Sequence, residues 1–121
     1  MGKVAVDAVL DGALDIIATA TEIYLCTSEP ANRAAAITAS VIPAHTMAGG
    51  DFTNADGDVS GRKVTVAAQN SLTADETGTV THVSLCTASV QLYVTTNTSQ
   101  LVTSGNTVNI GAWDIEIADP A

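Results

Sequence analysis

The stretches VTHVSLC (residues 80–86) and VQLYVT (90–95) decide the fold class, because apolar and polar residues alternate along both of them. Successive side chains of a β-strand point to opposite faces, so this alternation produces one apolar and one polar face. RKVTVAA (62–68) and WDIEI (113–117) show the same period of two. The pattern predicts antiparallel strands that cover a core on one side.

Turn-forming residues separate these strands at short intervals. Gly78 and SGN (104–106) lie between alternating runs, and NADGD (54–58) carries an Asp-Gly pair that favours a turn. Several short strands with regular turn signals are typical of a sandwich or barrel. We therefore expect a mainly β protein, an antiparallel β-sandwich or barrel over residues 22–121, with an irregular stretch at 31–50. A chain of 121 residues fits one domain, 1–121, because two would each lack a core.

Ahead of the β region, residues 4–20 have the pattern of an α-helix. Apolar residues recur there every three or four positions, which places them on one stripe. The stripe consists of Val6, Leu10, Ala13, Leu14 and Ile17. This N-terminal helix is expected to cap an open end of the β structure or to pack on a partner.

Charged residues suggest an interface. Asp7, Asp11 and Asp15 recur every four residues on a neighbouring helix face, and like charges at that spacing cost roughly 0.2–0.5 kcal/mol per pair. These aspartates form either a solvated face or an acidic contact strip for a basic partner. Arg62 and Lys63 hold half of the positive charge, and we expect an ion pair with Asp58 or an acidic neighbour.

The composition excludes several classes of function. Thirteen acidic residues against four basic ones give a net charge of −9, which repels nucleic acid and anionic membranes. No apolar run is long enough to span a membrane, and aspartates interrupt the N-terminal stretch, so we expect neither a membrane span nor a secretory signal. Aromatic residues make up only 3% of the chain. Such a light core suggests burial supplied by neighbouring copies.

The two cysteines, Cys26 and Cys86, lie in similar contexts, IYLCTS (23–28) and VSLCTA (83–88). These stretches are read as two neighbouring strands, which would bring the thiols close together. Buried free thiols and a disulfide, within or between chains, both remain open. His45 and His82 do not complete a zinc-ligand spacing, so no metal or other cofactor is expected.

No catalytic motif is present. NADGD (54–58) superficially resembles a calcium loop, but Val59 and Thr65 occupy the positions where an EF-hand needs Gly and Glu. Asp114 and Glu116 form a carboxylate pair, but strand alternation points them outward. We expect that the protein is not an enzyme.

Four segments carry a resemblance to a known group of proteins. They are DAVLDGAL (7–14), YLCTSEP (24–30), DGDVSGRKVTV (56–66) and WDIEIADP (113–120). They resemble small virion proteins of tailed bacteriophages, over most of the chain apart from 31–50. The resemblance implies a particle component made in many copies, such as a head decoration (cement) protein.

That resemblance implies a set of partners and a location. A decoration protein contacts the major capsid protein or other virion proteins, is assembled in the host cytoplasm and resides in the virion. It bridges capsid subunits, often as a homo-oligomer, with a trimer favoured. A neck or tail structural protein and a receptor- or glycan-binding module remain as alternatives, and the second expects exposed aromatic side chains.

Overall fold

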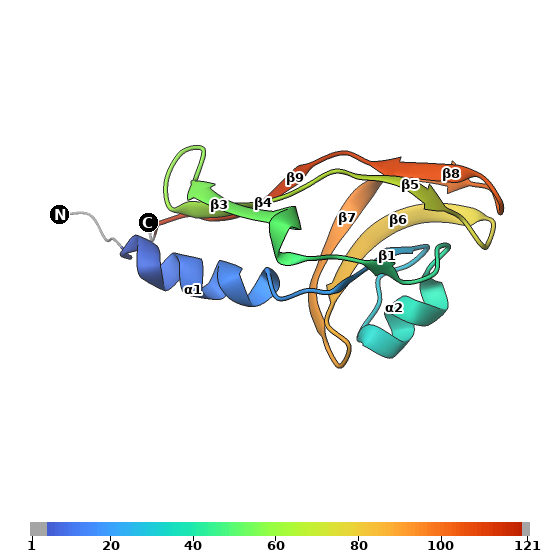
Figure 1. The fold of residues 1–121 in the computed structure, drawn as a ribbon, viewed down its shortest axis with the longest axis horizontal. Helices are drawn as coiled ribbons and strands as arrows, with labels where there is room; N and C mark the ends of the chain where they lie inside the picture. Colours follow the sequence, from blue (N-terminus) through green and yellow to red (C-terminus); the bar gives the residue numbers. More distant parts are fainter. Residues whose placement is uncertain (1–4, 120–121) are drawn as a thin grey trace.

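The computed structural model describes residues 5–119, and the chain is mainly β, with 46% of residues in strands and 18% in helices (Figure 1). The elements in chain order are α1 (Asp7–Ile17), β1 (Glu22–Cys26), α2 (Arg33–Ala39), β2 (His45–Thr46), the 3-10 turn η1 (Gly49–Asp51), β3 (Phe52–Asp56), β4 (Arg62–Val66), β5 (Gln69–Thr73), β6 (Gly78–Cys86), β7 (Gln91–Val102), β8 (Thr107–Ile110) and β9 (Trp113–Ile117).

The strands form antiparallel sheets. One has four strands in the order β2-β1-β6-β7, one has three in the order β3-β4-β9, and β5 pairs with β8. The expected antiparallel, mainly β fold with an N-terminal helix is confirmed, but the sheets do not close into a barrel.

A continuous hydrophobic core connects these sheets. Leu25 and Leu85 of the four-stranded sheet belong to the same buried cluster as Val64 of β4, Val108 of β8 and Leu14 of α1. Figure 1 shows an elongated molecule, with α1 beside β3 and β4 at one end and α2 beside β1 at the other. The core therefore runs along the molecule and holds both ends.

The N-terminal helix is shorter than the 4–20 predicted from its apolar spacing. It ends at Ile17, where Thr19 donates its hydroxyl to the Ile16 carbonyl at 2.6 Å. By Thr21 the chain has already joined the sheet, because its N–H donates to the Cys86 carbonyl at 2.9 Å. Sheet pairing thus stops the helix early. Residue 4, the expected start, lies outside the described residues.

The stretch 31–50, expected to be irregular, contains a second helix. Asn32 caps α2, since its side chain accepts a hydrogen bond from the Ala35 N–H at 2.9 Å. Ala36 buries fully against the four-stranded sheet, packed on Tyr24. The helix ends before Ser40, which makes an isolated bridge to Cys26 instead of a strand.

The turn expected at 54–58 lies further along the chain. Residues 54–56 belong to β3, and the loop that joins it to β4 spans 57–61. Its left-handed residue is Gly61, with φ +72°, rather than Gly57. A side chain at Gly61 would collide with the backbone of Ile117 and Ala118 at the end of β9. Glycine at this position therefore allows β4 and β9 to approach closely.

Candidate functional site

Arg62 of β4 binds the helix to the three-stranded sheet. Its Nε donates to Asp11 Oδ1 at 2.9 Å, and its Nη1 donates to Asp56 Oδ1 at 2.7 Å. Asp15 accepts from Asn54 Nδ2 at 2.9 Å. The basic partner of Asp11 therefore lies in the same chain, as does the amide that binds Asp15. Asp7 is exposed at the start of α1.

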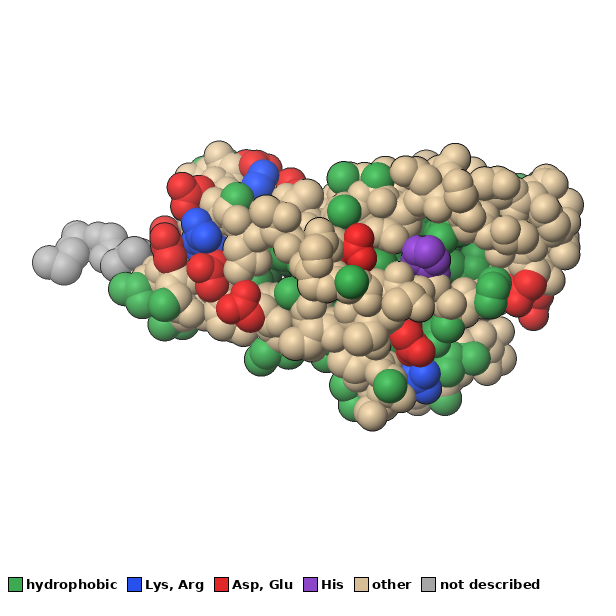
Figure 2. Space-filling model, in the orientation of Figure 1, with side chains coloured by type: hydrophobic (Ala, Val, Ile, Leu, Met, Phe, Trp, Pro, Cys, Tyr) green, Lys and Arg blue, Asp and Glu red, His purple; other side chains and the backbone are tan. Residues whose placement is uncertain are grey.

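Lys63 makes the ion pair expected from the sequence. Its Nζ lies 2.7 Å from Asp58 Oδ1 and 3.3 Å from Asp114 Oδ2. Thr65 donates to Asp114 Oδ1 at 2.7 Å, and this bond, with help from Lys63, lowers the pKa of Asp114. Figure 2 shows these basic side chains among acidic ones at the α1 end of the molecule. Both basic groups in this network are paired, and the acidic groups outnumber them, with Asp11, Asp56, Asp58 and Asp114 around Arg62 and Lys63.

The helix exposes more apolar side chains than it buries. Only Leu10 and Leu14 are buried. An adjacent face carries an apolar row that we call the α1 stripe. It consists of Val6, Val9, Ala13 and Ile16, and the three larger residues are 62–64% exposed (Figure 2). The predicted apolar stripe grouped Val6 and Ala13 with the residues that pack. The structure turns both outward, while Ile17 packs against the core beside the two leucines.

The two cysteines lie on neighbouring strands but are not bonded to each other. Both are buried and free. The pairing of β1 with β6 is antiparallel, so Cys86 lies opposite Glu22 whereas Cys26 lies opposite His82. Four residues of strand separate the two positions, about 13 Å, which exceeds the roughly 7 Å that a disulfide spans between α-carbons. Of the two outcomes left open, the structure shows buried free thiols: the offset excludes a disulfide within the chain, although both cysteines belong to one small buried cluster with Tyr24 and Ala36. Full burial also keeps both thiols from a neighbouring molecule.

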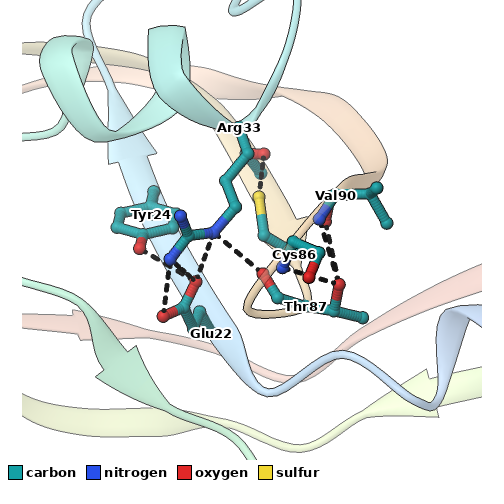
Figure 3. Close-up of polar contacts among 8 residues, drawn as sticks. Glu22, Tyr24, Arg33, Cys86, Thr87 and Val90 are labelled. Atoms are coloured by element: carbon teal, nitrogen blue, oxygen red, sulfur yellow. Dashed lines mark hydrogen bonds and ion pairs between the residues drawn. The ribbon is translucent and has the colours of Figure 1, made fainter.

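A polar cluster beside Cys86 joins α2 to the sheet (Figure 3). The Arg33 side chain donates from Nε to the Thr87 carbonyl at 2.9 Å and binds Glu22 through Nε and Nη2 at 3.0 and 3.1 Å. Tyr24 donates its hydroxyl to the same carboxylate at 3.0 Å. No local pattern predicted this cluster, because it joins residues up to 65 positions apart (residues 22 and 87). Its groups are mutually satisfied, which indicates a structural clamp.

The Cys26 thiol should make stability fall at high pH. Burial, with a smaller effect of Cys86, raises its pKa to about 11. In the unfolded chain the thiol ionises near 9, so between pH 9 and 11 the folded state holds the proton that the unfolded state loses. We expect this stabilisation to be complete below pH 9 and to decline by about 2–3 kcal/mol as the pH rises through 11.

Denaturant unfolding of the wild type and of Cys26→Ala, from pH 8 to 11, measures this effect. Cys26→Ala retains the other titrating groups, including Tyr24, whose pKa burial also raises. The difference between the two curves should shrink toward pH 11. Parallel curves would contradict the prediction.

Both histidines are also engaged in structural contacts. His45 Nε2 contacts Gln69 Oε1 at 3.0 Å, and His82 Nδ1 contacts the Thr81 hydroxyl at 2.8 Å. Within residues 5–119, no three His, Cys, Asp or Glu side chains gather as a metal site would require. In that same range no helix has the length and hydropathy to cross a membrane.

The comparisons with known proteins assign this chain to no family. No family model matches the sequence, and neither the curated proteins nor the solved structures include a match. The surfaces described above are therefore the basis for a functional proposal.

Proposed function

We propose that this protein is a structural component of a bacteriophage virion, a capsid decoration (cement) protein that stabilises the head by bridging capsid subunits. The observation that carries the proposal is the α1 stripe, an apolar helix face without a partner on an acidic β protein. The resemblance of four sequence segments to phage virion proteins supports the same role. In this proposal the protein is not an enzyme and needs no cofactor.

The stripe indicates the chemistry of its partner. Asp7 and Asp15 are exposed on the same helix, although Asp15 turns toward Asn54 of β3. Two stripes from separate copies would bring together two acidic molecules that each carry −9. An apolar capsid surface rimmed by Lys or Arg would cover the stripe without that repulsion. The homo-oligomer we propose, with a trimer favoured, would therefore assemble through other surfaces.

Cryo-electron microscopy of virions from the phage that encodes this chain tests the proposal. Density for this fold at junctions between capsid subunits, with α1 against the shell, would support it. A ring of copies at the neck or tail would replace it with that alternative. Absence from purified virions would overturn both, and a glycan array would then test a binding module.

A single substitution in the stripe should prevent incorporation into the particle. Val9→Asp adds charge to a surface that must lose its water, while the first helical turn tolerates an acidic residue. We expect copies per virion to fall at least tenfold. Val59→Asp is the matched control, because Val59 is 96% exposed in the β3–β4 loop, away from the stripe. Equal incorporation of both variants would contradict a role for the stripe.

A further inference from the structure

The strand β7 presents a long edge without a pairing partner. It is the last strand of the four-stranded sheet, spans Gln91–Val102 and pairs only with β6 among the described strands. Its twelve residues, QLYVTTNTSQLV, contain no charged residue and no proline. Natural sheets usually protect such edges with Lys, Pro, short strands or covering segments, because free main-chain groups accept another strand. Here the two register shifts in its pairing with β6, between Val80 and His82 and between Leu85 and Cys86, are the devices of this kind among the described residues.

A groove follows this edge. Two neighbouring cavities, of about 430 and 210 Å³, share Asn97, Ile110 and Gly111 in their linings. Val80 and Val83 of β6 contribute an apolar floor. The groove therefore lies between β7 on one side and the β8–β9 segment on the other.

The opposite wall also has unpaired edges. β7 and β8 are joined by a short turn, Thr103–Asn106, yet β7 pairs with β6 while β8 pairs with β5. β9 pairs only with β4 in the described part of the chain. The two walls diverge from the turn, and each leaves one side of its strand without a ladder partner. The gap lies where one further strand would continue the sheet.

We propose that this groove accepts an extended polypeptide segment from a partner protein, which adds as a strand along β7 between Thr95 and Val102. Free main-chain groups on the wall bind another main chain, and the apolar floor receives alternate side chains of an extended segment. A helix would satisfy its own main-chain groups and leave those of β7 unpaired.

The occupant is a single flexible segment rather than the sheet edge of a second copy. A strand fixed in a sheet brings its neighbouring strands with it. These would collide with the β8–β9 wall, which faces β7 across the groove.

Charge also restricts the composition of the segment. Asp114 is the only charged residue among those lining the two cavities, and the molecule carries −9. The segment should therefore contain Lys or Arg and lack acidic residues.

That the partner is a capsid protein rests on the proposed function. That β7 accepts a strand does not rest on it. A peptide selection that needs no virion tests the second claim without the first. The probe is a displayed library of random dodecapeptides, panned against the purified full-length protein. We expect peptides with alternating apolar residues and with Lys or Arg. Hydrogen exchange should show slower exchange of amides in residues 94–101 when a selected peptide binds.

Substitutions at Thr98 test the site directly. Thr98 is exposed and lies in the β-bulge, where the pairing register with β6 shifts between Val80 and His82. Thr98→Pro removes a main-chain N–H and places a ring where a strand would add, whereas the matched control Thr98→Ala keeps the N–H. Thr98→Lys leaves the main chain intact and repels a basic segment. It therefore tests binding at the same position if the proline variant does not fold. We expect affinity for a selected peptide to fall at least tenfold in Thr98→Pro and Thr98→Lys, and less than twofold in Thr98→Ala.

Three results would overturn the proposal. They are a library that yields no peptide protecting 94–101, selected peptides that bind both obstructing variants as well as the alanine control, and a consensus rich in Asp and Glu. Because the selection uses no particle, each of these can occur while the protein is found on phage heads. Conversely, a strand acceptor can be confirmed for a protein absent from virions.

Discussion

Gly61→Ala is expected to lower the free energy of unfolding by about 2–5 kcal/mol. The left-handed backbone at φ +72° costs a residue with a Cβ about 1–2 kcal/mol. In addition, the new methyl would collide with the Ile117 carbonyl oxygen and the backbone of Ala118, neither of which can rotate away. Forcing extra atoms into a packed site typically costs a further 1–3 kcal/mol. Equilibrium unfolding in urea measures the change.

Gly105→Ala is the matched control for Gly61→Ala. Gly105 also has a left-handed backbone, φ +89°, but a Cβ there meets nothing within 4 Å. Its cost should be limited to the conformational term, about 1–2 kcal/mol. If both variants lose the same stability, the close approach of β4 and β9 does not depend on glycine at position 61.

Leu14→Ala should destabilise the protein by about 2–5 kcal/mol, because Leu14 is fully buried and its removal leaves a cavity between α1 and the core. Ile16→Ala, two residues along, should change stability by less than about 0.5 kcal/mol. Ile16 is 62% exposed, and alanine has the higher helix propensity. Thermal and urea unfolding of the pair measure both effects.

This comparison also separates stability from binding. Under the proposed function, Ile16→Ala weakens incorporation into particles without loosening the fold, because the α1 stripe loses its largest residue. Leu14→Ala weakens both. A large loss of stability in Ile16→Ala would mean that the stripe is packed within the protein in solution, which would remove the main support for the proposal.

Alternation in the sequence predicted most of the strands. WDIEI (113–117) forms β9, with Ile115 buried and Asp114 and Glu116 outward, as expected from period two. VTHVSLC (80–86) lies within β6. These predictions succeed because side-chain direction in a strand is a local property. The ion pair between Lys63 and Asp58 could also be predicted, since a short loop keeps the two residues together.

The errors concern features that depend on distant parts of the chain. Helix α1 ends early because Thr21 pairs with Cys86, and Asp11 meets Arg62 because the helix docks on β4. The similarity of IYLCTS (23–28) and VSLCTA (83–88) correctly indicated neighbouring strands. It could not indicate their direction, and the antiparallel arrangement places equivalent residues at opposite ends of the ladder. Helix α2 had a local signal, Asn32 as an N-cap, which the alanine-rich stretch after it supports.

The pairing of β1 with β6 has a consequence during synthesis on the ribosome. Cys86 follows its partner Glu22 by 64 residues. At a translation rate of about 5–20 residues per second, β1 is therefore synthesised roughly 3–13 s before its partner strand. β4 and β5 are likewise synthesised before their partners β9 and β8. Meanwhile the apolar side of β1, with Ile23 and Leu25, has no sheet to cover it. A nascent chain with such late partners presents the kind of surface that holding chaperones bind, and its folding is paced by translation.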